Sequence, residues 1–232
     1  MTIVIVDKII VVAGTVVLLI AFILAFKLRK RKDLPIYFSF FYWIPFNRLL
    51  ISLNTFLGSI FKIVNQHNFI FFQNWLNLAE YLLVSLFFFK LFKKGNINIL
   101  IKIIFIVILA LIAFLFYIND LYSWLPELYS VYNFGIFIFC LYYYYKLIND
   151  AEPTLKLWAD PTFWIVTGLF LYAAITLPLF ALKDYLWANF GVLVAYITFV
   201  ITNVIIIVEY LLFIKAFRAA KDNVNNTDKE SV

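Results

Sequence analysis

The residues best suited to chemistry in this sequence are one arginine and one glutamate that lie inside long apolar stretches. Arg48 falls within the apolar run 36–58, and Glu80 falls within the next run, 69–91. A charge at the centre of a bilayer costs at least about 2.5–3.5 kcal/mol on insertion scales, so such residues face the protein interior and pair. The two runs would cross a membrane in opposite directions. We therefore expect Arg48 and Glu80 to meet near its middle.

Amide side chains accompany the two charges along both runs. Gln73, Asn77 and Glu80 follow the i, i+4, i+7 spacing of one helix face. Asn54 and Asn74 lie at matching depths in the membrane, so we expect a second polar contact between the two helices there, beside the ion pair. The candidate ligand-binding or coupling residues are Arg48, Glu80, Asn47, Asn54, Gln73, Asn74, Asn77 and Asn203.

Two interpretations of this polar group remain open. In the first, Arg48 and Glu80 form a satisfied ion pair that only fixes the register of two helices. In the second, the pair is the floor of a polar cavity open to the outside. The number of amides favours the cavity, because two charges need fewer partners. Glu209, in the last apolar run, is expected to lie near the membrane edge and to snorkel or pair with Lys215.

The elements that position these residues are membrane-spanning helices. The chain has 232 residues, of which 66% are hydrophobic, and a mean hydropathy of +0.98, whereas soluble domains have roughly 45–50% apolar residues. A spanning helix needs about 20 mostly apolar residues. We predict an all-α transmembrane domain over 1–220, followed by a polar, disordered cytoplasmic tail, 221–232. The seven predicted spans are 8–27, 36–58, 69–91, 97–118, 127–147, 162–182 and 188–214.

Basic residues set the expected orientation, because lysine and arginine are in excess in cytoplasmic loops. Threading seven spans puts 14 of the 19 basic residues on one side and places Lys8, Lys62 and Lys183 on the other. The N-terminus is therefore expected outside and the C-terminus in the cytoplasm, in a bacterial inner membrane. The basic residues on the cytoplasmic side are Lys27, Arg29, Lys30, Arg31, Lys32, Lys90, Lys93, Lys94, Lys146, Lys156, Lys215, Arg218, Lys221 and Lys229.

Local signals add detail to two of the spans. Asp160 and Pro161 are typical of a helix start, with aspartate as the N-cap and proline at the first helical position. Gly168 is expected to let two helices approach closely. Pro45, three residues before Arg48, is expected to bend the second span.

Residue types needed for several kinds of chemistry are missing from the spans. The single histidine, His67, falls in an expected loop, so haem ligation and a histidine-based zinc site are not expected. The single cysteine, Cys140, excludes a disulfide within the chain. No nucleophile motif such as G-x-S-x-G occurs. We therefore expect no enzyme activity, no cofactor, no metal and no nucleic-acid partner.

Two segments near the C-terminus resemble a group of membrane proteins. The residues 160–169, Asp-Pro-Thr-Phe-Trp-Ile-Val-Thr-Gly-Leu, are followed by Tyr172, and residues 210–217 read Tyr-Leu-Leu-Phe-Ile-Lys-Ala-Phe. They resemble uncharacterised seven-helix integral membrane proteins of Bacteroidota-type bacteria, over mainly the last two spans. Members of that group often occur beside, or fused to, sensor histidine kinases. The resemblance implies a membrane input module whose partner is a signalling protein such as a histidine kinase.

The leading functional hypothesis is a sensory or receptor-like module. It would bind a small ligand in an outward-facing cavity floored by Arg48 and Glu80 and would signal through a partner protein. The alternatives are a small-molecule or proton-coupled transporter, in which Glu80 is the coupling acid, and a structural subunit of a membrane complex. Many transporters have internal repeats and helices interrupted by glycine, but this sequence has few glycines and no evident repeat, which makes the transporter less favoured.

Overall fold

The structure is a computed structural model of the whole chain. It describes residues 2–31, 34–61, 66–92, 97–119, 125–150 and 157–230. Side chains are described over the same ranges except for 2–8, 54–61, 66–69, 97–98, 126, 150, 192–193, 195 and 223–230.

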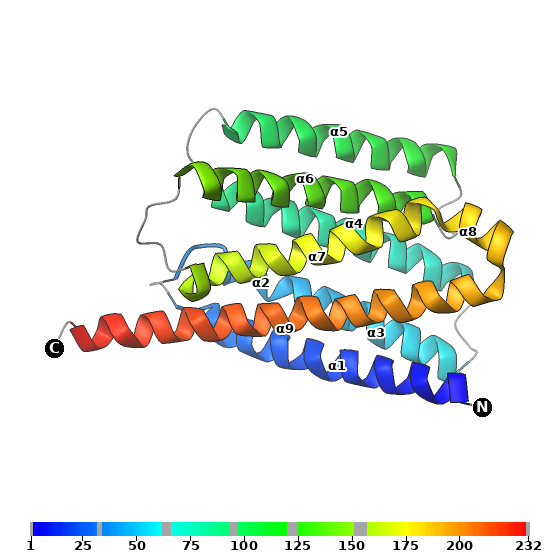
Figure 1. Cartoon of the computed structure of the whole chain (residues 1–232), viewed down its shortest axis with the longest axis horizontal. Coiled ribbons are helices and arrows are strands. Elements are labelled where there is room, and N and C mark those ends of the chain that lie inside the picture. Colours follow the sequence, from blue (N-terminus) through cyan, green and yellow to red (C-terminus); the bar gives the residue numbers. More distant parts are fainter. Residues whose placement is uncertain are drawn as a thin grey trace.

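The described residues form helices and contain no β-strand, so the predicted all-α fold is confirmed. Most of the long helices lie roughly along one common axis (Figure 1). The helices are α1 (Thr2–Leu28), α2 (Phe38–Phe41), α3 (Trp43–Phe61), α4 (Gln66–Leu91), α5 (Ile97–Ile118), α6 (Pro126–Asp150), α7 (Pro161–Ala181), α8 (Lys183–Phe190) and α9 (Val192–Glu230), with a 3-10 turn, η1, at Leu157–Ala159.

Five helices in the described part of the chain are long and apolar enough to cross a membrane. They contain the segments Ile9–Leu28, Ile99–Ile118, Glu127–Asn149, Pro161–Ala181 and Tyr196–Asp222. Helices α3 and α4, which cover most of the predicted runs 36–58 and 69–91, are not among the five. Side chains of α3 are described only over 43–53, a stretch too short to be assessed as a span, and α4 carries the polar residues around Glu80.

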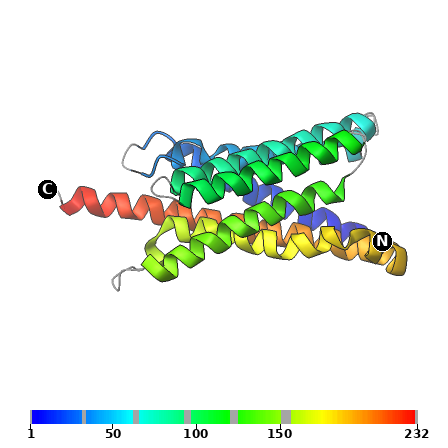
Figure 2. The same ribbon diagram turned by 90° about the horizontal axis from the view of Figure 1, so that it is seen from above.

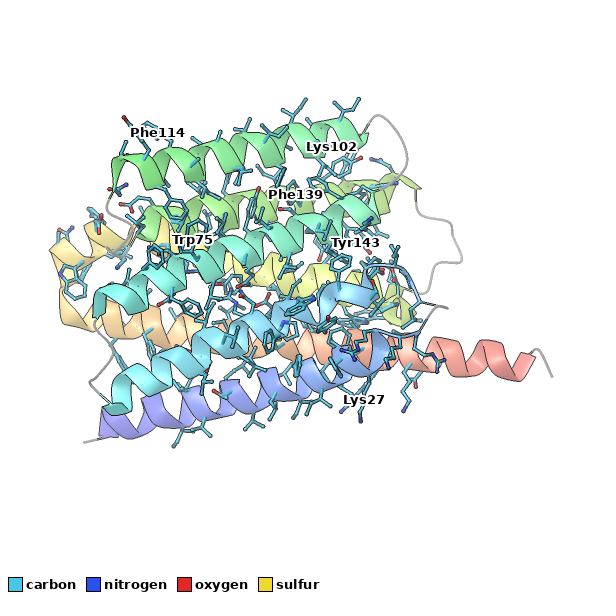
Figure 3. All side chains as sticks on the ribbon, turned by 180° about the vertical axis from the view of Figure 1, so that it is seen from behind. Lys27, Trp75, Lys102, Phe114, Phe139 and Tyr143 are labelled. Carbon is cyan, nitrogen blue, oxygen red and sulfur yellow. The ribbon has the colours of Figure 1, made fainter. Side chains whose placement is uncertain are left out.

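The outer surface is apolar where a bilayer would touch it. Helix α1 exposes Ile9, Val12 and Val16, and α5 exposes Ile106 and Phe114. Figure 3 shows Phe114 on the outer edge of the bundle. Large exposed apolar surfaces mark contact with lipid or with another protein. The fold and surface together define a helical protein of the multi-pass membrane type.

The most extensive contact between two helices in the described part of the chain is between α7 and α9. Gly168 of α7 faces α9: a Cβ atom added there would lie 3.0 Å from Cε1 of Phe213 and 3.1 Å from the backbone oxygen of Glu209. The prediction that Gly168 permits close helix approach is confirmed. At the start of α7, Asp160 accepts a hydrogen bond from the backbone N–H of Thr162 at 2.8 Å, which confirms the predicted N-cap.

The second predicted span is divided in the structure. Helix α2 ends at Phe41, Tyr42 forms a turn, and α3 begins at Trp43. Pro45 therefore lies in the first turn of α3, where the missing N–H of proline costs no helical hydrogen bond. The expected bend near Arg48 takes the form of this interruption.

The C-terminal segment differs from the prediction. Helix α9 continues without a break to Glu230, so residues 221–230 are helical rather than disordered. A helix nucleated in a packed bundle extends at little cost, since each added residue gains a hydrogen bond. This end of α9 projects beyond the bundle, and the N-terminus lies at the opposite end (Figures 1 and 2).

Candidate functional site

The predicted ion pair lies at the centre of the structure. Nη2 of Arg48 in α3 lies 2.7 Å from Oε1 of Glu80 in α4, and Nε donates to the same oxygen at 2.8 Å. Arg48 is 6% exposed and Glu80 is 2% exposed. Because both contacts use one oxygen, Oε2 of Glu80 has no hydrogen-bond partner among the described residues. The prediction that Arg48 and Glu80 pair is confirmed.

A third helix completes the surroundings of the guanidinium. The ring of Tyr172, from α7, lies 4.8 Å from Cζ of Arg48. A guanidinium this close to an aromatic face gains a favourable cation–π interaction, which is stronger when water is excluded. Arg48 is therefore fixed from α4 by charge and from α7 by an aromatic ring.

The amides of α4 contact a tyrosine near the start of α6. Gln73 and Asn77 both donate to the hydroxyl oxygen of Tyr129, at 3.0 Å and 2.5 Å. The ring of Tyr129 stacks on Phe180 with centroids 5.0 Å apart. Tyr129 thus joins the start of α6 to α4 and to the end of α7.

These side chains line a cavity of about 400 Å³. Arg48 and Tyr172 lie at its inner end, and α8 contributes Lys183 and Trp187 at the other. Its walls are mostly apolar, and no aspartate or glutamate belongs to the described lining. The polar lining side chains are Thr15, Arg48, Ser52, Gln73, Asn77, Tyr129, Tyr172, Lys183, Thr198, Thr202 and Asn203.

The cavity occupies the half of the bundle that contains α8. The lining residues of α1 and α9 lie mainly in the halves of these helices that are near α8, for example Val11 in α1 and Thr198 in α9. Lys183 is partly buried there, and burial lowers the pKa of its ammonium group, while the nearby Asp184 and Glu127 act in the opposite direction. The cavity therefore has a cation at each end.

The remaining predicted site residues divide into three groups. Asn203 lines the cavity as expected, and its amide donates to the backbone oxygen of Phe199 at 2.8 Å. Asn47 and Asn74 are buried but do not belong to the lining; the Asn47 amide instead donates to the backbone oxygen of Leu76 at 2.8 Å and ties α3 to α4. The side chain of Asn54 lies outside the described residues, so the expected contact with Asn74 stays a prediction.

The interpretation of Glu209 is wrong. Its side chain is fully buried, and it acts electrostatically on Arg48 and Glu80. Lys215, its expected partner, is exposed, and its ammonium lies 3.4 Å from the centre of the Trp164 ring. The error arose because the last span was expected to end near residue 214, whereas α9 continues to Glu230 and places Glu209 near its middle.

A signal for the burial of Glu209 is present in the sequence. Phe213, Ala216, Phe217 and Ala220 follow it at i+4, i+7, i+8 and i+11, the positions of one helix face, and all are buried. Aromatic and small residues on that face indicate contact with other helices rather than with the aqueous edge.

No metal site is evident in the part of the chain that the structure describes, where no group of three histidine, cysteine, aspartate or glutamate side chains comes together. Cys140 is a buried free thiol. Comparison with known proteins adds no assignment: no protein-family model, curated protein or solved structure matches this sequence.

Proposed function

We propose that the chain is a receptor-like membrane module that binds a small amphipathic ligand in the cavity above Arg48 and signals through a partner protein. The observation that carries the proposal is a fixed arginine at the inner end of a cavity of about 400 Å³ with mostly apolar walls. Binding pockets for small molecules typically have volumes of about 300–1,000 Å³, apolar walls and a few convergent polar groups.

The chemistry of the lining favours a ligand with an apolar body and a neutral or anionic polar group. Leu18, Ile51, Phe180 and Ile206 would contact the apolar part. Hydrogen-bond donors at the inner end would contact the polar part, with Arg48 as a charged donor. Because the described lining holds cations and no carboxylate, a cationic ligand would find no opposite charge there.

In this proposal α3 and α4 cross the membrane together with the five more apolar helices, which gives seven spans. The described basic residues support an N-terminus outside and a C-terminus in the cytoplasm. Figure 3 shows Lys27 and Lys102 toward the end from which α9 projects, with Trp75 and Phe114 toward the other. In this orientation the cavity opens on the outer side of a bacterial inner membrane.

Helix α9 is the proposed route of the signal. Thr198 and Asn203 line the cavity, and the same helix extends to Glu230 beyond the bundle. A shift of α9 on ligand binding would move this projecting end, where Arg218 and Lys221 could contact an acidic surface of a partner such as a histidine kinase.

Affinity purification of the tagged protein from its native membrane, with mass spectrometry of bound proteins, tests the partner. A co-purifying signalling protein whose activity changes in a Thr198→Trp variant, which fills the cavity, supports the proposal. Ile197→Trp is the matched control, since Ile197 is exposed on the same helix. If the protein is isolated alone and moves solutes across proteoliposome membranes, the receptor proposal is wrong and the chain is a carrier.

A further inference from the structure

The buried charges at the inner end of the cavity do not balance. Arg48, Glu80 and Glu209 are all buried, so the described core contains two carboxyl groups and one guanidinium. The contacts of Arg48 go to Oε1 of Glu80. Neither oxygen of Glu209 has a hydrogen-bond partner among the described residues.

Titratable groups from four other helices interact electrostatically with Glu209. Arg48 comes from α3, Glu80 from α4, Cys140 from α6 and Tyr172 from α7. On α9 itself, Tyr210 is adjacent. Among these groups Arg48 is the only cation, and Glu80 already engages it.

An isolated carboxylate is costly to bury, because it loses its hydration without gaining a counter-charge. If Arg48 left Glu80 to pair with Glu209, the carboxylate of Glu80 would remain buried without a counter-charge. The arrangement therefore has electrostatic balance when exactly one of the two carboxyls is neutral.

We propose that Arg48, Glu80 and Glu209 form a proton-binding site in which one proton is held by the two carboxyls, on Glu209 while Arg48 pairs with Glu80. Removing Glu80 frees Arg48 to compensate Glu209, which then releases its proton. The site adjoins the cavity through Arg48, but its proton does not depend on a ligand, so it stands whether the chain is a receptor or a carrier.

Infrared spectroscopy of the purified protein in lipid tests the site, because the C=O stretch of a protonated carboxyl is distinct from the bands of a carboxylate. At a pH of about 7, exposed glutamates with a pKa of about 4.3 are ionised. The wild-type protein is expected to show a protonated-carboxyl band that shifts on uniform labelling with ¹³C-glutamate. Glu209→Gln is expected to lose the band, and Glu80→Gln is expected to lose it as well. Glu127→Gln, at an exposed position of α6, should keep it.

Three results would overturn the proposal. The first is the absence of a protonated-carboxyl band in the wild-type protein. The second is a full band in Glu209→Gln. The third is a full band in Glu80→Gln, since Glu209 would then hold its proton independently of the ion pair. The labelled wild-type spectrum needs no variant, so the first result can be obtained even if a substitution prevents folding.

Discussion

Replacing Gly168 with alanine should destabilise the contact between α7 and α9. The added Cβ would lie 3.0 Å from Cε1 of Phe213 and 3.1 Å from the backbone oxygen of Glu209. Favourable contacts lie at about 3.5–4.0 Å between carbon atoms and at about 3.3–3.6 Å between carbon and a carbonyl oxygen, so both distances are too short. The Phe213 ring has buried neighbours and the oxygen belongs to a helix backbone, so neither can simply rotate away. Overpacking of this kind typically costs about 1–3 kcal/mol.

Gly14→Ala is the matched control for this prediction. Its Cβ would meet only the Ile207 side chain, at 3.7 Å and 4.0 Å, which is ordinary contact. Alanine also favours a helix over glycine by up to about 1 kcal/mol in water, so this variant should be neutral or stabilised. Thermal unfolding of both variants in the same detergent compares them directly. An unfolding temperature for Gly168→Ala equal to or above that of Gly14→Ala would refute the packing described between α7 and α9.

Three further changes test the polar centre and the start of α7. Replacing Glu80 and Glu209 together with glutamine leaves Arg48 without a buried counter-charge and should cost about 3–5 kcal/mol, more than the two single changes combined; additive effects in unfolding experiments would contradict a shared proton. Tyr129→Phe removes the oxygen that accepts from α4 and should cost about 1–3 kcal/mol, because donors are left unpaired; unchanged stability would mean that these bonds contribute little. Asp160→Ala removes the N-cap of α7 and should cost about 0.5–2 kcal/mol, whereas Asp160→Asn should retain most of it; equal losses in the two variants would contradict a capping role.

The sequence was sufficient to predict those features that one dominant energy term decides. Composition requires helices in a membrane, and a buried arginine requires a counter-ion, so the all-α fold and the Arg48–Glu80 pair followed. The N-cap at Asp160 and the close approach at Gly168 followed from local sterics and hydrogen bonding. Each of these depends on a residue type and its immediate neighbours.

Features that depend on where a helix ends, or on which side of it a neighbour packs, could not be predicted in the same way. Hydropathy placed the end of the last span near residue 214, and this put Glu209 at an edge rather than in the centre. Asn47 is next to Arg48 in the sequence, which does not say whether its side chain faces a cavity or another helix. The position of α4 decides this, because the Asn47 amide donates to the backbone oxygen of Leu76. The cavity itself depends on the placement of α8, whose short, polar-containing sequence gave no indication of it.

We expect the cavity above Arg48 to hold a small ligand. Mass spectrometry of small molecules extracted from the purified protein tests it most directly, with wild-type, Thr198→Trp and Ile197→Trp proteins prepared in parallel. An amphipathic compound is expected to accompany the wild-type and Ile197→Trp proteins and to be depleted from Thr198→Trp. Identical extracts from the three proteins, each folded and equally pure, would contradict it.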